Sequence, residues 1–195
     1  MRRSMVVPML VALAGLSTRL AAQGTTTDSS TTKEPSHHAI GFGYFATLGS
    51  YWQIEAAEIG YVRRMSHGLA AFSVSGRVGT FIDETAVVGG TKGIVFAPTL
   101  AARTHMKRIA QLGEDERGTA IGLDVTVEAS AYFAGGSPFW QGPRWGAIAL
   151  LPGLRIGNAA IVIGPTAFFA GNKPAVRGLL AFRGEAPLAR KERHP

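Results

Sequence analysis

The chain of 195 residues contains no cysteine, and charged residues make up only 17% of it. The lack of cysteine excludes disulfides, thiolate metal sites and a lipid attached at a cysteine. No apolar run reaches the roughly 20 residues that a membrane-spanning helix needs. Helical periodicity is also scarce, and only 106–112 has the pattern of a turn of helix. What the chain does have is a regular alternation of apolar and polar residues.

The first 23 residues have the composition of a secretory signal peptide. Arg2 and Arg3 precede an apolar run at 5–16, and small residues lead up to an expected cleavage after Ala22 or Gln23. The run is too short to span a bilayer. The sequence therefore predicts an exported protein.

The rest of the chain divides by composition into three parts. Residues 24–38 are polar and low in complexity and predict a disordered linker. Residues 39–184 contain the strand-like segments of a β-barrel, and 185–195 form a polar C-terminal tail. Three of the 20 basic residues fall in the signal peptide, which leaves 17 basic against 13 acidic residues. The basic residues do not cluster with aromatics, so nucleic acid is not an expected partner.

The most informative segment is 119–133, where apolar residues from Ile121 to Phe133 alternate with polar ones. Strand side chains point alternately to opposite faces, so this segment has one apolar face and one face with Asp124 and Glu128. At fifteen residues it is also longer than the usual strand of about 5–6. Such a strand suits a wall between an apolar and a polar medium.

Eight segments of this kind follow one another between turn residues. They are 40–48, 51–63, 69–82, 93–106, 119–133, 145–156, 159–170 and 175–183. Alternation breaks near Ala56 and Ala57, which predicts a bulge there. Pro98, Pro152 and Pro165 each remove a ladder donor. A hairpin turn at Asn158-Ala159 would place Pro152 directly opposite Pro165, so that both interruptions share one place.

Such strands bury their apolar faces in one of two ways. The apolar side chains face lipid, as in membrane barrels, or face inward around a ligand, as in lipocalin-type barrels. Strand length and mid-strand charges favour the membrane, because a tilted span needs about 9–11 residues. The charges predicted to pair in the lumen are Arg77, Arg103, Asp124, Glu128, Arg155 and Arg177. The aromatics predicted to form an interfacial girdle are Tyr51, Trp52, Phe139, Trp140 and Trp145.

With this signal peptide, strand count and alternation, residues 39–184 resemble the small bacterial outer-membrane β-barrels of the OmpA transmembrane-domain type. The resemblance implies an all-β fold, an eight-stranded antiparallel up-and-down transmembrane barrel with both chain ends in the periplasm. Such barrels usually finish on an aromatic residue. Here Phe182 is followed by Arg183 and the polar tail.

We therefore expect a non-enzymatic outer-membrane protein with a side-chain-filled lumen and a structural or surface-interaction role. Its partner would be outer-membrane lipid, with no cofactor, and any surface ligand would meet loops 83–92 and 134–144. A soluble periplasmic lipocalin-like barrel is the alternative. Its apolar cavity would be lined by Phe42, Phe72, Phe96 and Leu123.

The histidines are the remaining candidates for chemistry. His37 and His38 are adjacent in the linker, but no matching ligand cluster indicates a metal site. Ser66-His67 is a possible nucleophile and base of a lipid-acting barrel enzyme, although the pair falls in an expected tight turn. His105 could act as a base beside Asp124 or Glu128. A structural hydrogen bond in the lumen is the expected role, so no catalytic residue is predicted.

Overall fold

The structure is a computed structural model, and it describes residues 37–49, 52–83, 91–113, 118–136, 143–169 and 174–188. All of them belong to one compact unit, Ser36–Pro195. The predicted signal peptide, residues 24–36 of the predicted linker and residues 189–195 of the predicted tail lie outside the described residues. So do most of the two predicted ligand-binding loops.

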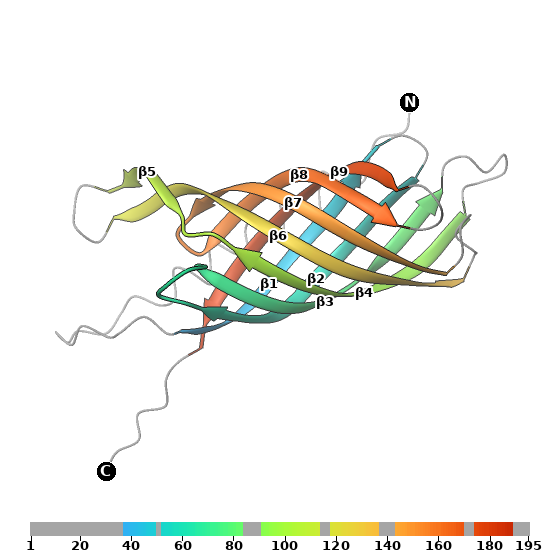
Figure 1. Cartoon of the computed structure of the whole chain (residues 1–195), viewed down its shortest axis with the longest axis horizontal. Coiled ribbons are helices and arrows are strands. Elements are labelled where there is room, and N and C mark those ends of the chain that lie inside the picture. Colours follow the sequence, from blue (N-terminus) through green and yellow to red (C-terminus); the bar gives the residue numbers. More distant parts are fainter. Residues whose placement is uncertain are drawn as a thin grey trace, which may run out of the picture. The chain divides into compact units, whose positions relative to one another are not determined.

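The described residues form nine strands and are all-β (Figure 1). The strands are β1 (His38–Leu48), β2 (Trp52–Arg64), β3 (Ala71–Asp83), β4 (Thr91–Arg103), β5 (Lys107–Leu112), β6 (Thr119–Gly136), β7 (Arg144–Ile156), β8 (Ala159–Phe169) and β9 (Ala175–Pro187). No helix among the described residues is long and apolar enough to cross a bilayer.

Eight of these strands close into an antiparallel barrel. Their hydrogen-bonded order is β4-β3-β2-β1-β9-β8-β7-β6, and an additional pairing of β4 with β6 joins the two ends. Closure removes the unpaired edges that an open sheet would leave. This confirms the predicted eight-stranded antiparallel barrel.

The ninth strand, β5, corrects the helical turn predicted at 106–112. All six residues of β5 are exposed, and the strand pairs with β6 through a register shift between Arg108 and Ala110. The prediction was wrong because β6 is 18 residues long and β4 pairs with it only from Thr126 to Gly136. The residues of β6 before Thr126 therefore have a free edge on the side of β4, and pairing with that edge decides the conformation of a short segment with weak local preference.

Two local register predictions were also wrong. The ladders of β2 run through Ala56 and Ala57 without a shift, so there is no bulge at that point. Between β7 and β8, Ile156 pairs with Ala159 across a Gly157-Asn158 turn, where Gly157 has a φ of 57°. Two-residue hairpin turns need positive φ, which glycine adopts without strain. Pro165 therefore lies opposite Leu150 rather than Pro152.

The prolines nevertheless share one interruption of the β7–β8 ladder. Pairing stops after Ala149 with Thr166 and resumes at Gly153 with Val162, and Pro152 and Pro165 both fall in that gap. Both are exposed on the outer face. The missing donors of these two strands thus weaken the wall at one shared place. Pro98 falls in a second gap, where the β4–β6 pairing passes from Phe96 to Thr99.

The barrel extends beyond the predicted limits of 39 and 184. His38 already belongs to β1, and β9 continues to Pro187, which pairs with Ala39. Glu185 is therefore a barrel residue rather than part of the tail. Gly184 follows Phe182 without making a turn, and the alternation continues through Arg183 and Glu185 on the lumen face.

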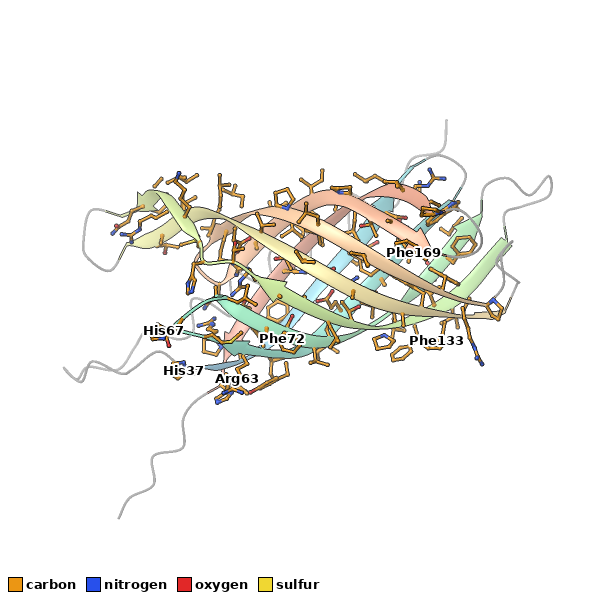
Figure 2. All side chains as sticks on the ribbon, in the orientation of Figure 1. His37, Arg63, His67, Phe72, Phe133 and Phe169 are labelled. Carbon is orange, nitrogen blue, oxygen red and sulfur yellow. The ribbon has the colours of Figure 1, made fainter. Side chains whose placement is uncertain are left out.

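The two faces of the wall differ sharply in chemistry. On β6, Leu123 and Val127 are about half exposed, at 50% and 48%, whereas Asp124 and Glu128 are buried, at 3% and 2%. The same holds around the barrel, where side chains of aliphatic and aromatic residues cover the outside (Figure 2). Polar and charged groups face the lumen at the end that carries the β2–β3 and β7–β8 turns.

At the other end the lumen is filled by apolar side chains. The larger buried members of this cluster are Phe45, Trp52, Ile54, Phe81, Val95, Tyr132, Trp145, Leu151, Phe168 and Leu179. Trp52 packs edge-on against Phe168 with ring centroids 5.1 Å apart. The interior thus has an apolar half and a charged half.

The charged lumen as the candidate functional site

The charged half of the lumen is built by inward-facing residues of six strands. They are Glu58 and Arg64 from β2, Arg77 from β3, Arg103 from β4, Asp124 and Glu128 from β6, Arg155 from β7, and Arg183 and Glu185 from β9. Residues two apart on a strand face the same way, so each pair on one strand follows from alternation. Five arginines thus meet four carboxylates in a narrow interior.

Four of these residues form a deep group: Glu58, Arg77, Glu128 and Arg183. Arg77 donates from Nε to Glu58 at 2.7 Å and from Nη2 to Glu128 at 2.6 Å. Arg183 pairs with the same two carboxylates, at 3.4 Å from Glu58 and more closely to Glu128. Each arginine therefore bridges two acids, and each acid bridges two arginines.

The other five residues form a rim group nearer the turns: Arg64, Arg103, Asp124, Arg155 and Glu185. Glu185 accepts from all three arginines, at 2.9 Å from Arg64 Nη2, at 3.3 Å from Arg155 Nη1, and from Arg103. Arg155 Nε also donates to Asp124 at 2.8 Å. Glu185 is thus the centre of this group.

A glycine makes room for the rim group. A Cβ placed on Gly153 would lie 2.9 Å from Asp124 Oδ1 and 2.7 Å from a methyl carbon of Val162. Any larger residue there would push against the carboxylate that holds Arg155. Gly153 is therefore part of the site, although it has no side chain of its own.

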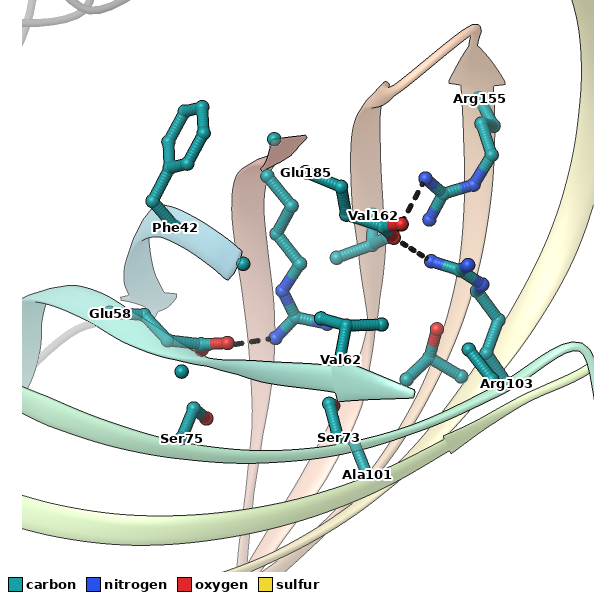
Figure 3. Close-up of a pocket in the computed structure, with 16 residues that line it drawn as sticks. Phe42, Glu58, Val62, Ser73, Ser75, Ala101, Arg103, Arg155, Val162 and Glu185 are labelled. Carbon is teal, nitrogen blue, oxygen red and sulfur yellow. Dashed lines mark hydrogen bonds and ion pairs between the residues drawn. The ribbon is translucent and has the colours of Figure 1, made fainter. Parts of the chain in front are cut away.

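A small cavity lies between the deep group and the rim group (Figure 3). Its volume is about 50 Å³, and its lining includes Glu58, Ser75, Arg103, Arg155 and Glu185. A water molecule needs about 10–15 Å³ of such space, whereas ligand pockets usually measure about 300–1,000 Å³. The cavity therefore suits a few water molecules that bridge charged groups.

The electrostatics of the lumen favour a fixed network rather than a reactive site. All four carboxylates accept hydrogen bonds from guanidinium groups. Arginine is always charged and binds carboxylates through several donors at once. The arrangement links six strands to one another across the lumen through ion pairs.

The predicted lumen charges are brought together except for one. Arg77, Arg103, Asp124, Glu128 and Arg155 all belong to the two groups. Arg177 does not, because it lies on β9 six residues before Arg183, in the apolar half of the lumen. Its guanidinium carbon lies 5.0 Å from the centre of the Trp52 ring, a cation–π contact.

The predicted aromatic girdle is wrong for the two members that the structure describes. Trp52 and Trp145 are 3% and 5% exposed and lie inside the barrel, where Trp145 stacks on Tyr132. The physical reason is that the apolar half of the lumen also needs large apolar side chains, so a position near a strand end does not fix the face. Tyr51, Phe139 and Trp140 lie outside the described residues.

Other aromatics occupy the outer surface near the barrel ends. Phe133 and Phe169 are 43% and 46% exposed at one end, and Tyr61 and Phe72 are 43% and 40% exposed toward the other. Figure 2 shows Phe133 and Phe169 far along the barrel from Phe72. Their outward parity follows from the alternation of β6, β8, β2 and β3.

The histidines lie away from the lumen groups. Ser66 Oγ and His67 Nδ1 are 3.0 Å apart in the exposed β2–β3 turn, and His105 is exposed between β4 and β5. Asp124 and Glu128, its possible partners, bond to arginines instead. His38 stacks on Tyr61 at the barrel end. Within the described ranges, no three His, Asp or Glu side chains are grouped to hold a metal ion.

Four network members were not among the sequence candidates: Glu58, Arg64, Arg183 and Glu185. Glu58 was hidden by the bulge expected beside it, and Arg64 and Glu185 lie just past the predicted strand ends. The signal that finds two of them is the parity of β9, where Arg177, Leu179, Ala181, Arg183 and Glu185 fall on one face. Extending that alternation places both Arg183 and Glu185 in the lumen.

Comparison of the chain with protein-family models, curated proteins and solved structures finds no match. The fold and the geometry of the lumen are therefore the basis for a functional conclusion.

Proposed function

We propose that the chain is a non-enzymatic bacterial outer-membrane protein, of the OmpA transmembrane-domain type, whose lumen is filled by side chains. It is exported by the signal peptide at 1–23 and contributes to envelope structure or to surface contact. The observation that carries the proposal is the apolar outer wall around a lumen of paired charges.

The outer wall is apolar on every barrel strand. Ile59, Ile94 and Val176 are more than 60% exposed, and Leu100, Ile148, Leu150 and Ile163 are more than half exposed. The largest apolar patch on a typical soluble monomer covers about 300–600 Å². A wall of this kind that runs around the whole barrel suits hydrocarbon and not water.

The height of the apolar wall matches a bilayer. On β7 the outward residues run from Gly146 to Ile156, which is ten residue steps. At about 3.3 Å per residue and a tilt of about 40°, these steps rise by about 25 Å. Membrane barrels carry an apolar band of about 25 Å between two sets of aromatic residues. Tyr61, Phe72, Phe133 and Phe169 suit those positions.

The packed lumen supports a structural role rather than transport. An eight-stranded barrel leaves an interior that side chains can fill. Here it is filled by the apolar cluster at one end and by the deep and rim groups at the other. A surface role would use the loops 83–92 and 134–144.

The soluble alternative has less support. Of the residues that it needs in an apolar cavity, Phe72, Phe96 and Leu123 are 40%, 47% and 50% exposed on the outer wall. A ring carbon of the fourth, Phe42, lies 2.5 Å from where a Cβ on Gly184 would stand, and Gly184 is its cross-strand partner on the outer face. Phe42 is among the residues that line the small cavity of Figure 3, but it shares that lining with Glu58, Arg103 and Arg155, so the cavity is not the apolar one that the alternative needs.

Cell fractionation combined with heat-modifiable electrophoresis tests the proposal. The mature protein is expected in the outer-membrane fraction, and the unheated sample is expected to migrate as a compact species that boiling converts to a slower one. Recovery of the mature protein in the soluble periplasmic fraction would overturn the proposal in favour of the soluble barrel.

A further inference from the structure

The charges of the deep and rim groups do not cancel. The deep group pairs two arginines with two carboxylates. The rim group holds three arginines, Arg64, Arg103 and Arg155, against the two carboxylates of Asp124 and Glu185. A charge that is kept from water is costly unless a group of opposite sign compensates it. The rim group is therefore short of one negative charge.

Glu185 and Asp124 are both shared between arginines. The single negative charge of Glu185 is divided among Arg64, Arg103 and Arg155. Asp124 lies 2.8 Å from Arg155 Nε and 3.8 Å from Arg103 Nε. The side chains of Arg103 and Arg155 are only 15% and 10% exposed, so bulk water solvates little of either charge. Neither of these two arginines has a carboxylate to itself.

The cavity of Figure 3 lies against this surplus of positive charge. The charged part of its lining consists of Arg103, Arg155, Arg183, Glu58 and Glu185. The hydroxyl groups in its lining belong to Ser73, Ser75 and Thr126. Guanidinium groups only donate hydrogen bonds, and hydroxyl groups can turn to donate. The lining therefore suits an occupant that carries negative charge and accepts hydrogen bonds.

One donor of the lining is buried without a partner. Arg183 contacts Glu58 and Glu128 through Nη2, whereas its Nε is buried and has no hydrogen bond to the described residues. A buried donor in this state is destabilising. Asp124 Oδ1 is a buried acceptor without a partner, but Asp124 is not among the described lining residues and this oxygen lies beside Gly153. It is therefore not the acceptor that Arg183 lacks.

We propose that the cavity binds one small monovalent anion of the size of chloride. One negative charge cancels the surplus, and a halide ion accepts hydrogen bonds without offering any. The volume of about 50 Å³ exceeds the roughly 10–15 Å³ that a water molecule needs, but it is far below the roughly 300 Å³ of the smallest usual ligand pockets. The site goes beyond the structural role proposed above, and it does not depend on the membrane location.

A comparison of chloride with gluconate at equal ionic strength tests the proposal, because gluconate has the same charge but is too large for the cavity. The measurement is the urea midpoint of the full chain folded in micelles of an uncharged detergent. A site with a dissociation constant of about 10 mM raises the folding equilibrium constant roughly tenfold at about 100 mM chloride. We therefore expect a higher midpoint in chloride. Broadening of the chlorine-35 NMR signal by the folded protein reports binding directly.

Two variants separate the surplus charge from the cavity. Arg64 is not among the described lining residues, and Arg64→Met leaves four arginines with four carboxylates. Ala101→Leu fills the cavity and keeps every charge. Both are expected to abolish the effect of chloride.

Arg63→Met is the matched control. Arg63 is the exposed neighbour of Arg64 on the outer face, so its replacement changes the charge of the chain by the same amount outside the lumen. The effect of chloride on the urea midpoint is expected to persist in this variant. Heat-modifiable migration shows whether each variant has folded.

Several results would overturn the site. One is an equal midpoint of the wild type in the two salts, and another is an unbroadened chlorine signal. A chloride effect that survives in Ala101→Leu would arise elsewhere on the chain, and one that survives in Arg64→Met would show that the surplus charge does not attract the anion. If Ala101→Leu does not fold, the chlorine signals of Arg64→Met and Arg63→Met decide. The membrane location is tested separately by cell fractionation.

Discussion

Arg77 and Glu128 form an ion pair inside the barrel with 2.6 Å between Arg77 Nη2 and Glu128 Oε2, and each side chain is 2% exposed. Arg77 also contacts Glu58 at 2.7 Å and lies 4.5 Å from the centre of the Phe45 ring. It therefore joins the deep group to the apolar half of the lumen. Both charged groups are buried away from bulk solvent.

Replacing Arg77 by methionine is expected to lower the free energy of unfolding by about 3–5 kcal/mol, because two buried carboxylates lose a partner. Urea titration of the protein folded in micelles or vesicles measures this. Arg63→Met is the matched control, since Arg63 is exposed at the end of β2, and it is expected to change stability by less than about 0.5 kcal/mol. Equal effects of the two substitutions would show that the pair contributes nothing specific.

Glu185→Gln is expected to lower the free energy of unfolding about as much as a substitution in the deep group, although Glu185 lies close to the end of the barrel. It leaves Arg103 and Arg155 with Asp124 as their one remaining carboxylate, and Arg64 with only the amide oxygen of Asn158 at 3.0 Å, so a loss of about 3 kcal/mol is expected. The midpoint of urea unfolding reports it. Ending the chain after Leu188 keeps β9 complete and is expected to leave the midpoint unchanged. An unchanged urea midpoint in Glu185→Gln would show that Glu185 does not stabilise the barrel, as expected for a residue of the tail.

The alternation of apolar and polar residues was sufficient to predict the barrel and, for most strands, which residues face outward and which face the lumen. On β6, Asp124 and Glu128 fall on one parity and Val125 and Val127 on the other, and the fold keeps them apart. Strand pairing is local in an up-and-down barrel, so strand count and turns nearly determine the topology. The membrane location is a further step that alternation alone does not decide.

The predictions that were wrong concern positions where two effects compete. Trp52 looked like an interfacial residue because it begins a strand, but the apolar half of the lumen also needs bulky side chains. β5 has little preference of its own, and the free edge of β6 fixes it as a strand. Which carboxylate meets which arginine depends on the stagger of strands around the closed barrel. A pattern read along one strand does not contain that information.

Val127→Arg tests which medium the outer wall faces. Val127 is 48% exposed near the middle of β6. In a bilayer, an arginine at mid-depth on the lipid face costs about 2–4 kcal/mol, so folding into vesicles should become less complete. In a soluble barrel the same arginine would face water and be harmless. The folded fraction by heat-modifiable electrophoresis is the measurement.

The matched control for this substitution is Ile109→Arg. Ile109 is 56% exposed on β5, beside the part of β6 that pairs with Arg155 and Ile156 at the end of β7. It lies at the edge of the apolar band, where an arginine costs only about 0–1 kcal/mol, so folding into vesicles is expected to change much less than in Val127→Arg. Normal folding of Val127→Arg would count against a lipid-facing wall.

The inward position of Trp52 and Trp145 can be checked by fluorescence. Trp140→Phe leaves these two as the only tryptophans of the chain. Because both rings are at most 5% exposed within the lumen, bromine atoms on lipid acyl chains should quench them less than a tryptophan on the outer wall. Adding Phe133→Trp provides that reference, since Phe133 is 43% exposed. Equal quenching of the two variants would place the native tryptophans at the lipid interface, where their positions at strand ends first suggested they belong.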